Sequence, residues 1–235
     1  MSEYPTIIYC ATRESDIREA ELSASSVRTH YGNIEIFLFT NLPDYQNENF
    51  NRIIQIHNPR VDYSDKIQAL IQVDRRRVLF LDGDTFLISK IDELFELLNQ
   101  FDIAIAHAPN RWTHQLAISD AFPEFNTGVI LINKTWRVRR FLSEWKRSYV
   151  NDLIQDIDFP SKDQIRFRES LYQSKIRFAT LTPEYNCRFT MGCMVSHKVK
   201  LLHGRSKDFN KIAKEINLGP VNSWSKEPIV RWVKY

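Results

Sequence analysis

Residues 77–86 read Arg-Val-Leu-Phe-Leu-Asp-Gly-Asp-Thr-Phe, and this stretch decides the expected fold. Its apolar residues, 78–81, form an uninterrupted β-prone run, which is typical of a strand buried on both faces of a parallel or mixed sheet. Asp82 and Asp84 follow at once, and side chains two residues apart on an extended backbone point the same way. Gly83 leaves room for a ligand between them.

This pair of carboxylates predicts a divalent-metal site. Ligands of open α/β sheets bind beyond the carboxyl ends of the strands, where Asp82 and Asp84 are expected to lie. Two such carboxylates repel each other unless a cation lies between them. The same residues could instead form an ordinary acidic turn at the end of a strand, because a D-x-D sequence is short.

The composition indicates one globular domain over residues 1–235. Of the residues, 43% are hydrophobic and 26% charged, which argues against disordered, fibrous and coiled-coil proteins. The 32 basic and 29 acidic residues nearly balance, so no nucleic-acid partner is expected. We find no apolar run near the roughly 20 residues of a transmembrane segment and no signal-peptide pattern, and therefore expect a cytoplasmic protein. Three cysteines without C-x-x-C spacing argue against disulfides and structural zinc.

Short apolar runs alternate with amphipathic stretches, which predicts alternating strands and helices. We expect strands over 6–10, 34–39, 52–56, 78–81, 102–106, 129–132, 175–180 and 198–202, and helices over 16–30, 65–73, 89–100, 134–150 and 163–172. This order predicts an α/β fold with a mostly parallel central sheet flanked by helices. Residues 107–125 are expected to form a long loop or a short irregular helix, which could carry function or be only a mobile surface insertion, and 219–235 a C-terminal tail.

Polar residues near the predicted strands and helices are candidates for the rest of a binding site. Ala11 and Thr12 lie in the loop after the first strand, which could admit a flat ligand ring or serve only as a helix cap. Lys66 falls in the first turn of a helix, where a solvated side chain is the simplest interpretation. Residues 125–128, Phe-Asn-Thr-Gly, precede a buried strand; Gly128 permits close approach of the backbone to a ligand, but the same residues favour a β-turn.

Two later segments add further candidates. Asp163 and Gln164 fall in the first turn of a helix, where an acid could serve only for capping and the helix dipole. The last predicted strand leads into His203, Gly204, Arg205 and Lys207. Imidazole binds manganese-like ions, and the two cations offset phosphate charge, so this segment predicts a metal and phosphate site, although a lone histidine can also be structural.

In this order, the residues resemble the glycogenin and bacterial galactosyltransferase-like group of GT-A-fold glycosyltransferases, which use nucleotide-diphosphate sugars. The likeness spans most of the chain and rests on Ala11-Thr12, Lys66, Asp82-Gly83-Asp84, Phe125-Asn126-Thr127-Gly128, Asp163-Gln164, Tyr185-Asn186 and His203-Gly204. The resemblance implies a single Rossmann-like GT-A domain over 1–235.

The resemblance also implies a role for each matched residue. It places Mn²⁺, or Mg²⁺, on Asp82, Asp84 and His203. It places the donor on Ala11, Thr12, Lys66, Asp82, Gly83, Thr127, Gly128 and Gly204, with Arg205 or Lys207 on the phosphates, and puts Asn126, Asp163 and Gln164 at the reaction centre. The implied reaction moves a sugar from a UDP-sugar to an acceptor hydroxyl with retention. The acceptor, a glycan, a lipid-linked sugar or a protein, is left open and is expected along 107–125 and the C-terminal tail, 219–235.

Two other functions fit part of this pattern. A haloacid-dehalogenase-like phosphatase also has D-x-D after an apolar strand, but Phe86 stands where its motif has threonine or valine, and the strand lies far from residue 1. A catalytically silent sugar-nucleotide-binding protein would keep the same residues without turnover.

Overall fold

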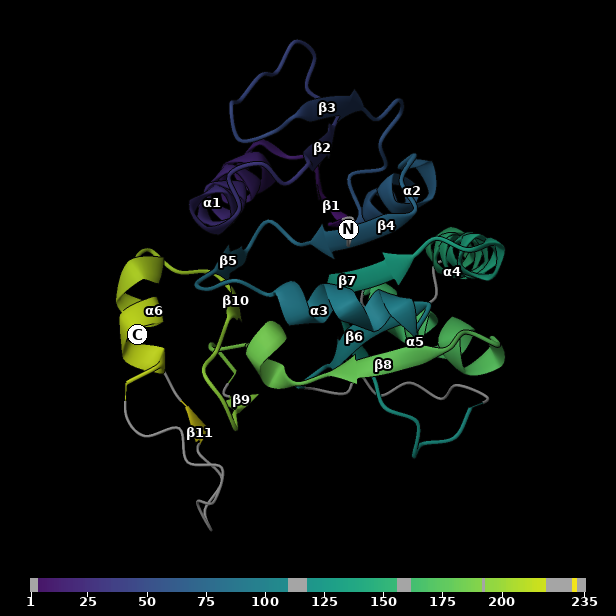
Figure 1. Cartoon of the computed structure of the whole chain (residues 1–235). Coiled ribbons are helices and arrows are strands. Elements are labelled where there is room, and N and C mark those ends of the chain that lie inside the picture. The colour runs from purple at the N-terminus through teal and green to yellow at the C-terminus, as the bar shows by residue number, and fades with distance from the viewer. Residues whose placement is uncertain (1–3, 110–117, 156–161, 192, 219–229, 232–235) are drawn as a thin grey trace.

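The computed structural model describes residues 4–109, 118–155, 162–191, 193–218 and 230–231. Within them, a central sheet of seven strands has the order β3-β2-β1-β4-β7-β6-β8 (Figure 1). These strands are β1 (Thr6–Ala11), β2 (Ile36–Thr40), β3 (Arg52–Gln55), β4 (Arg77–Leu81), β6 (Ile103–His107), β7 (Phe125–Asn133) and β8 (Phe178–Leu181). β7 runs antiparallel to β4 and β6, and the other neighbours pair in parallel. The predicted mostly parallel sheet is confirmed.

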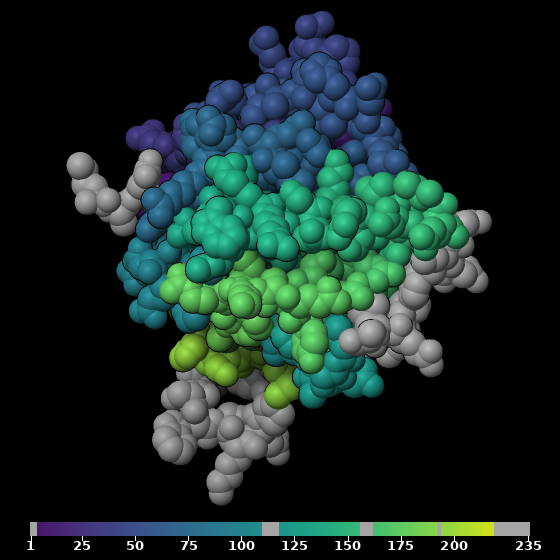
Figure 2. Space-filling model, turned by 90° about the vertical axis from the view of Figure 1, so that its right-hand side faces the viewer, coloured from purple at the N-terminus to yellow at the C-terminus, as the bar shows by residue number. Residues whose placement is uncertain are grey.

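Helices cover both faces of this sheet. One face packs against α1 (Glu14–His30), α3 (Asp92–Glu96) and the 3₁₀ helix η1 (Leu97–Asn99), and the other against α2 (Tyr63–Gln72), α4 (Trp136–Ile154) and α5 (Asp163–Gln173). Alternate residues of one strand enter different cores, Ile7 and Tyr9 on one face and Ile8 on the other. In the view of Figure 2 blue segments lie at the top, green ones cross the middle and yellow-green ones lie near the bottom.

A smaller unit lies beside the carboxyl ends of the central strands β1 and β4. In it, β5 (Thr85–Leu87) pairs antiparallel with β10 (Leu201–His203), next to α6 (Phe209–Ile216) (Figure 1). We call its apolar interior, which includes Phe189, Leu202 and Phe209, the C-terminal core. The 3₁₀ helix η2 (Pro183–Tyr185) precedes this unit, and β9 (Cys193–Met194) pairs with β11 (Val230–Arg231).

Some elements differ from the prediction. Residues 125–128 do not form a turn but begin β7, which starts four residues before its purely apolar part. The helix expected over 89–100 is divided into α3 and η1, and the last strand starts later and contains His203. β5, only three residues long, carries too little periodicity to be found in the sequence. Cys187 is disulfide-bonded, so the expectation of no disulfide is wrong, whereas Cys10 is free.

Parts of the expected loop and tail lie outside the described residues, namely 110–117 of the loop over 107–125, and 219–229 and 232–235 of the tail. The described end of the loop is tied to α5, because Arg168 donates hydrogen bonds to the carbonyl oxygens of Ser119 and Phe122, both at 2.9 Å. Within the described part of the chain, every helix is too short or too polar to cross a bilayer.

Candidate active site

A cavity of about 460 Å³ opens at the carboxyl ends of β1 and β4. The predicted residues that line it are Thr12, Lys66, Asp82, Gly83, Asp84, Asn126, Asp163, Gln164, His203 and Arg205. The other predicted residues do not line it: Ala11, Thr127, Gly128 and Gly204 are buried, and Lys207 is exposed. The edge of the sheet expected to bind a ligand therefore does carry a cavity.

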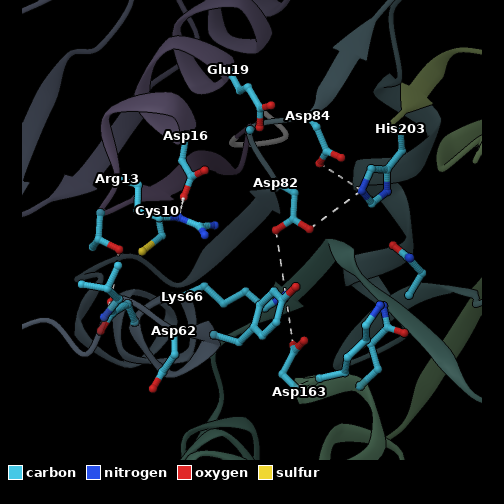
Figure 3. Close-up of a pocket in the computed structure, with 18 of the residues that line it drawn as sticks. Cys10, Arg13, Asp16, Glu19, Asp62, Lys66, Asp82, Asp84, Asp163 and His203 are labelled. Atoms are coloured by element: carbon cyan, nitrogen blue, oxygen red, sulfur yellow. Dashed lines mark hydrogen bonds and ion pairs between the residues drawn. The ribbon is translucent and has the colours of Figure 1, made fainter. Parts of the chain in front are cut away.

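Asp82, Asp84 and His203 form a compact group on this cavity (Figure 3). One potential ligand atom from each lies within 4.8 Å of the others. Nε2 of His203 is 3.3 Å from Oδ1 of Asp84 and 3.8 Å from Oδ2 of Asp82. The aspartates flank the turn between β4 and β5, and His203 pairs with Thr85 in the β5–β10 ladder. That short ladder brings the histidine to the aspartates.

Asn186 fixes the orientation of the His203 imidazole. Nδ1 of His203 donates to Oδ1 of Asn186 at 2.7 Å. Nδ2 of Asn186 donates to Oδ1 of Asn126 at 3.1 Å, and the same oxygen accepts the backbone N–H of Gly128 at 3.1 Å. These bonds turn the Asn186 oxygen toward the histidine, so Nε2 faces the two aspartates, where it can donate to a carboxylate or, without its proton, bind a metal ion. This is the arrangement that a metal-binding histidine needs.

Gly128 makes room for the group. A Cβ atom at this position would lie 2.2 Å from Cε1 of His203 and 2.6 Å from Oδ2 of Asp82. The backbone of β7 is held there, because the N–H of Asp82 donates to the Gly128 carbonyl at 2.7 Å. The close approach at Gly128 is therefore to the side chains of this group, and a larger residue would displace them.

Lys66, which the sequence suggested as a solvated lysine, is buried inside the site (Figure 3). Its Nζ lies 3.0 Å from Oδ2 of Asp163 and 3.9 Å from Oδ1 of Asp82, and donates to Oγ1 of Thr127 at 3.0 Å. Oγ1 of Thr127 in turn donates to Oδ2 of Asp163 at 2.7 Å. Trp145 Nε1 donates to the Asp163 carbonyl at 2.9 Å, which fixes the start of α5. These contacts link α2, β7 and α5 at one point.

The charges of the site shift its pKa values. Burial lowers the pKa of Lys66, but the Asp163 and Asp82 carboxylates outweigh burial and raise it, so the lysine stays charged. Burial raises the pKa of Asp82 by more than the adjacent cations lower it. Burial also acts on Asp84, but the hydrogen bond and charge of the His203 imidazole outweigh it and lower the pKa. The pKa values of the two neighbouring carboxylates are therefore shifted in opposite directions, as expected for like charges that share a site.

The loops after β1 and before α2 meet at the other end of the cavity. Oγ1 of Thr12 donates to Oδ2 of Asp65 at 3.2 Å, and Asp65 also accepts the backbone N–H groups of Arg60 and Val61 at 3.0 and 2.8 Å. Val61 has a φ of 59°, which a β-branched residue seldom adopts. Asp65 therefore holds a strained loop against the loop after β1.

Several charged residues of the cavity wall escaped the sequence prediction. α1 contributes Asp16 and Glu19, and Glu19 accepts hydrogen bonds from Nε and Nη2 of Arg205 at 2.6 and 3.0 Å. Arg188 also lines the wall. The signal for α1 was available, because acids three residues apart near the start of a helix share one face. For Arg188 the only clue was its position two residues after the matched asparagine.

Comparison with known proteins adds information on the fold. No family model and no curated protein sequence matches the chain. Among solved structures it is similar to the glycosyltransferase GlyE of Streptococcus pneumoniae TIGR4, with a TM-score of 0.61 and 17% identity over 93% of this chain. It is also similar to the galactosyltransferase LgtC in complex with donor and acceptor sugar analogues, with a TM-score of 0.56 and 16% identity over 90% of this chain and 92% of LgtC.

The chain has the fold of these glycosyltransferases. A third structure, an active-site mutant of LgtC, has a TM-score of 0.57 at 17% identity over 90% of this chain and 94% of its own. The chain spans only 62% of the length of GlyE. The GT-A fold expected from the sequence is confirmed.

The glycosyltransferase fold bears on the two alternative functions. The phosphatase alternative depended on D-x-D after the first strand of another fold, whereas here it follows β4, next to the antiparallel β7. Phe86, at the deviating position, stacks on Phe209 in the C-terminal core with ring centroids 4.9 Å apart. The silent-binding alternative shares the glycosyltransferase fold, so only an activity measurement separates it from an enzyme.

Proposed function

We propose that this protein is a metal-dependent glycosyltransferase that moves a sugar from a nucleotide-diphosphate donor, a UDP-sugar, to an acceptor hydroxyl with retention of configuration. The observation that carries the proposal is the group of Asp82, Asp84 and His203 on the cavity of a glycosyltransferase fold. A departing nucleoside diphosphate develops negative charge, which a metal ion and fixed cations stabilise. The cavity offers side chains that could bind a metal ion and basic side chains that could serve as fixed cations.

The three side chains fit a divalent cation. They present two carboxylates and one imidazole within 4.8 Å, and the hydrogen bond of His203 to Asn186 leaves Nε2 free to bind the ion. Gly128 keeps the space beside them open. The imidazole favours Mn²⁺ over Mg²⁺, which prefers oxygen ligands. When bound, the ion would supply positive charge to the diphosphate of the donor.

Asp163, Gln164 and Asn126 are assigned to the transferred sugar. Asp163 and Gln164 begin α5 and line the cavity. Because Oδ2 of Asp163 already accepts a hydrogen bond from Thr127 and pairs with Lys66, it is a poor covalent nucleophile. We assign Asp163 to binding the sugar and to electrostatic support of the oxocarbenium-like state. Retention would then not pass through an Asp163 ester.

Titration of UDP with and without MnCl₂, followed by calorimetry, tests the metal and donor assignments. We expect Mn²⁺ to strengthen UDP binding by at least about tenfold, since each 1.4 kcal/mol corresponds to that factor. Asp84→Ala should abolish this gain. Glu14→Ala, which removes an exposed carboxylate on α1, is the control and should keep it. UDP binding that is the same with and without Mn²⁺, and unchanged by Asp84→Ala, would contradict the proposal.

Release of UDP from a panel of UDP-sugars in the presence of Mn²⁺ separates an enzyme from a silent binding protein. We expect turnover with at least one sugar, and Asp163→Asn should lower kcat more than it weakens donor binding. The anomeric configuration of the product, read by NMR, tests retention. Tight donor binding without turnover of any sugar in the panel would favour the silent alternative.

A further inference from the structure

The arginines of the cavity differ in what their guanidinium groups contact. Arg13 pairs with a carboxylate of α1 at 2.8 Å, and Arg205 pairs with Glu19 through two hydrogen bonds. Arg188, in contrast, has no carboxylate partner among the described residues. Its Nη2 lies 4.0 Å from the thioether sulfur of Met191, and its Nε is buried without a hydrogen-bond partner. A buried charged donor without an acceptor is unfavourable, so it points to a ligand that supplies one.

The backbone holds Arg188 next to the metal-binding group. The N–H of His203 donates to the carbonyl oxygen of Cys187 at 2.8 Å, and Cys187 forms a β-bridge with Leu202. In such an extended segment the residues on either side of Cys187 point to the same side. One of them, Asn186, binds the His203 imidazole, and the other, Arg188, lines the cavity. The same short segment therefore orients the histidine and delivers a cation beside it.

The charges of the site explain why this cation matters. A divalent ion would be balanced by the two aspartates, while Lys66 is offset by Asp163 and Arg205 by Glu19. A diphosphate adds further negative charge, and Arg188 carries a positive charge that no described carboxylate pairs with.

We propose, on the basis of the proposed function, that Arg188 is the arginine that binds the donor's diphosphate beside the metal ion. A guanidinium group binds phosphate oxygens through two parallel charge-assisted hydrogen bonds. This assignment moves the phosphate cation from the segment after His203, where the sequence placed it on Arg205 or Lys207, to the segment before it. Lys207 is exposed and does not line the cavity, and Arg205 is held by Glu19.

Calorimetric titrations of the full chain with three probes test this assignment: MnCl₂ alone, inorganic pyrophosphate with Mn²⁺, and UDP with Mn²⁺. We expect Arg188→Gln to weaken pyrophosphate and UDP binding by about 10- to 100-fold, the range for a lost charge-assisted hydrogen bond. Arg188→Lys should lie between this variant and the natural chain. Mn²⁺ binding should be unchanged in both variants. Arg18→Gln, an exposed arginine of α1, is the matched control and should bind all three probes as the natural chain does.

The possible failures are distinguishable. Unchanged pyrophosphate and UDP binding in Arg188→Gln overturns the role of Arg188 and leaves the proposed function standing. Loss of Mn²⁺ binding in both Arg188 variants also overturns it, because the residue would then support the metal site itself. Failure of the natural chain to bind UDP while it binds pyrophosphate rejects the uridine donor and leaves Arg188 tested by pyrophosphate. Failure to bind either ligand overturns the proposed function together with the role of Arg188.

Discussion

Substitution of Gly128 by alanine tests the metal site most directly. The added Cβ would lie 2.2 Å from Cε1 of His203 and 2.6 Å from Oδ2 of Asp82, whereas non-bonded carbon atoms rest about 3.5–4.0 Å apart. The imidazole must therefore move by more than about 1 Å. Metal–ligand distances tolerate deviations of only about 0.2 Å, so the histidine can no longer bind the ion together with the aspartates.

We expect Gly128→Ala to lower the affinity for Mn²⁺ by at least about 100-fold. Loss of a group that merely supports a ligand costs about 10- to 100-fold, and here a ligand itself is displaced. The fold should persist, because the clashing atoms belong to the ends of side chains that can rotate. Overpacking of about 1–3 kcal/mol corresponds to a fall in Tm of less than about 12 °C for a domain of this size.

Electron paramagnetic resonance of free Mn²⁺ gives the affinity, and circular dichroism reports the fold. Gly32→Ala is the matched control, since a Cβ atom at Gly32 would meet nothing within 4 Å, and this variant should bind Mn²⁺ normally. A Gly128→Ala protein that is folded and binds Mn²⁺ as tightly as the natural chain would refute the placement of the ion between Asp82 and His203.

Three further outcomes are expected. Asn186→Ala removes the acceptor of His203 Nδ1 and should weaken Mn²⁺ binding by about 10- to 100-fold; unchanged affinity by the same resonance assay would show that the imidazole needs no such support. Lys66→Met leaves Asp163 buried without its ion-pair partner, so it should lower the free energy of unfolding, measured in urea, by about 3–5 kcal/mol. The double variant with Asp163→Asn should recover part of this loss. A loss below about 1 kcal/mol would contradict the prediction. Burial raises the pKa of Glu184, but hydrogen bonds from a threonine hydroxyl and backbone N–H groups outweigh burial and lower it. The stabilisation by Glu184 is thus present above the unfolded pKa of about 4.3 and lost as the pH falls through the lowered folded pKa. The difference in unfolding free energy between the natural chain and Glu184→Gln should therefore shrink from pH 6 toward pH 3. A difference independent of pH would contradict this prediction.

The central part of the fold could be predicted because its signals are local. The apolar run before Asp82 is a buried strand of the sheet, and Asp163 begins a helix as expected. Such signals depend only on neighbouring residues, which carry the hydrophobic period. The identity and order of the matched residues then indicated a cavity at one edge of the sheet, and most of them do line it.

What the sequence could not show are contacts between residues distant in the chain. Lys66 looked like a solvated lysine because its carboxylate partner, Asp163, lies on another helix. The polar residues before Val129 looked like a turn because one group that satisfies Asn126 inside the strand, the side-chain amide of Asn186, is on another segment. For Arg188 the sequence offers only its position two residues after Asn186. Its importance follows only from the backbone contacts that place it beside the histidine.

His203 does not belong to the central sheet but to β10, which contributes Leu202 to the C-terminal core. A metal ion shared with the two aspartates after β4 would therefore tie β10 to the sheet beside a contact it already makes, because Leu201 of β10 packs in the core on one face of the sheet. By linkage, the free energy of ion binding also stabilises this contact between β10 and the sheet. We expect amide hydrogen exchange in β10 and α6 to slow when the ion binds, and to quicken again when the ion departs with the spent nucleotide. In this chain, the rate of product release and the local opening around β10 would then both depend on the same metal–ligand bonds.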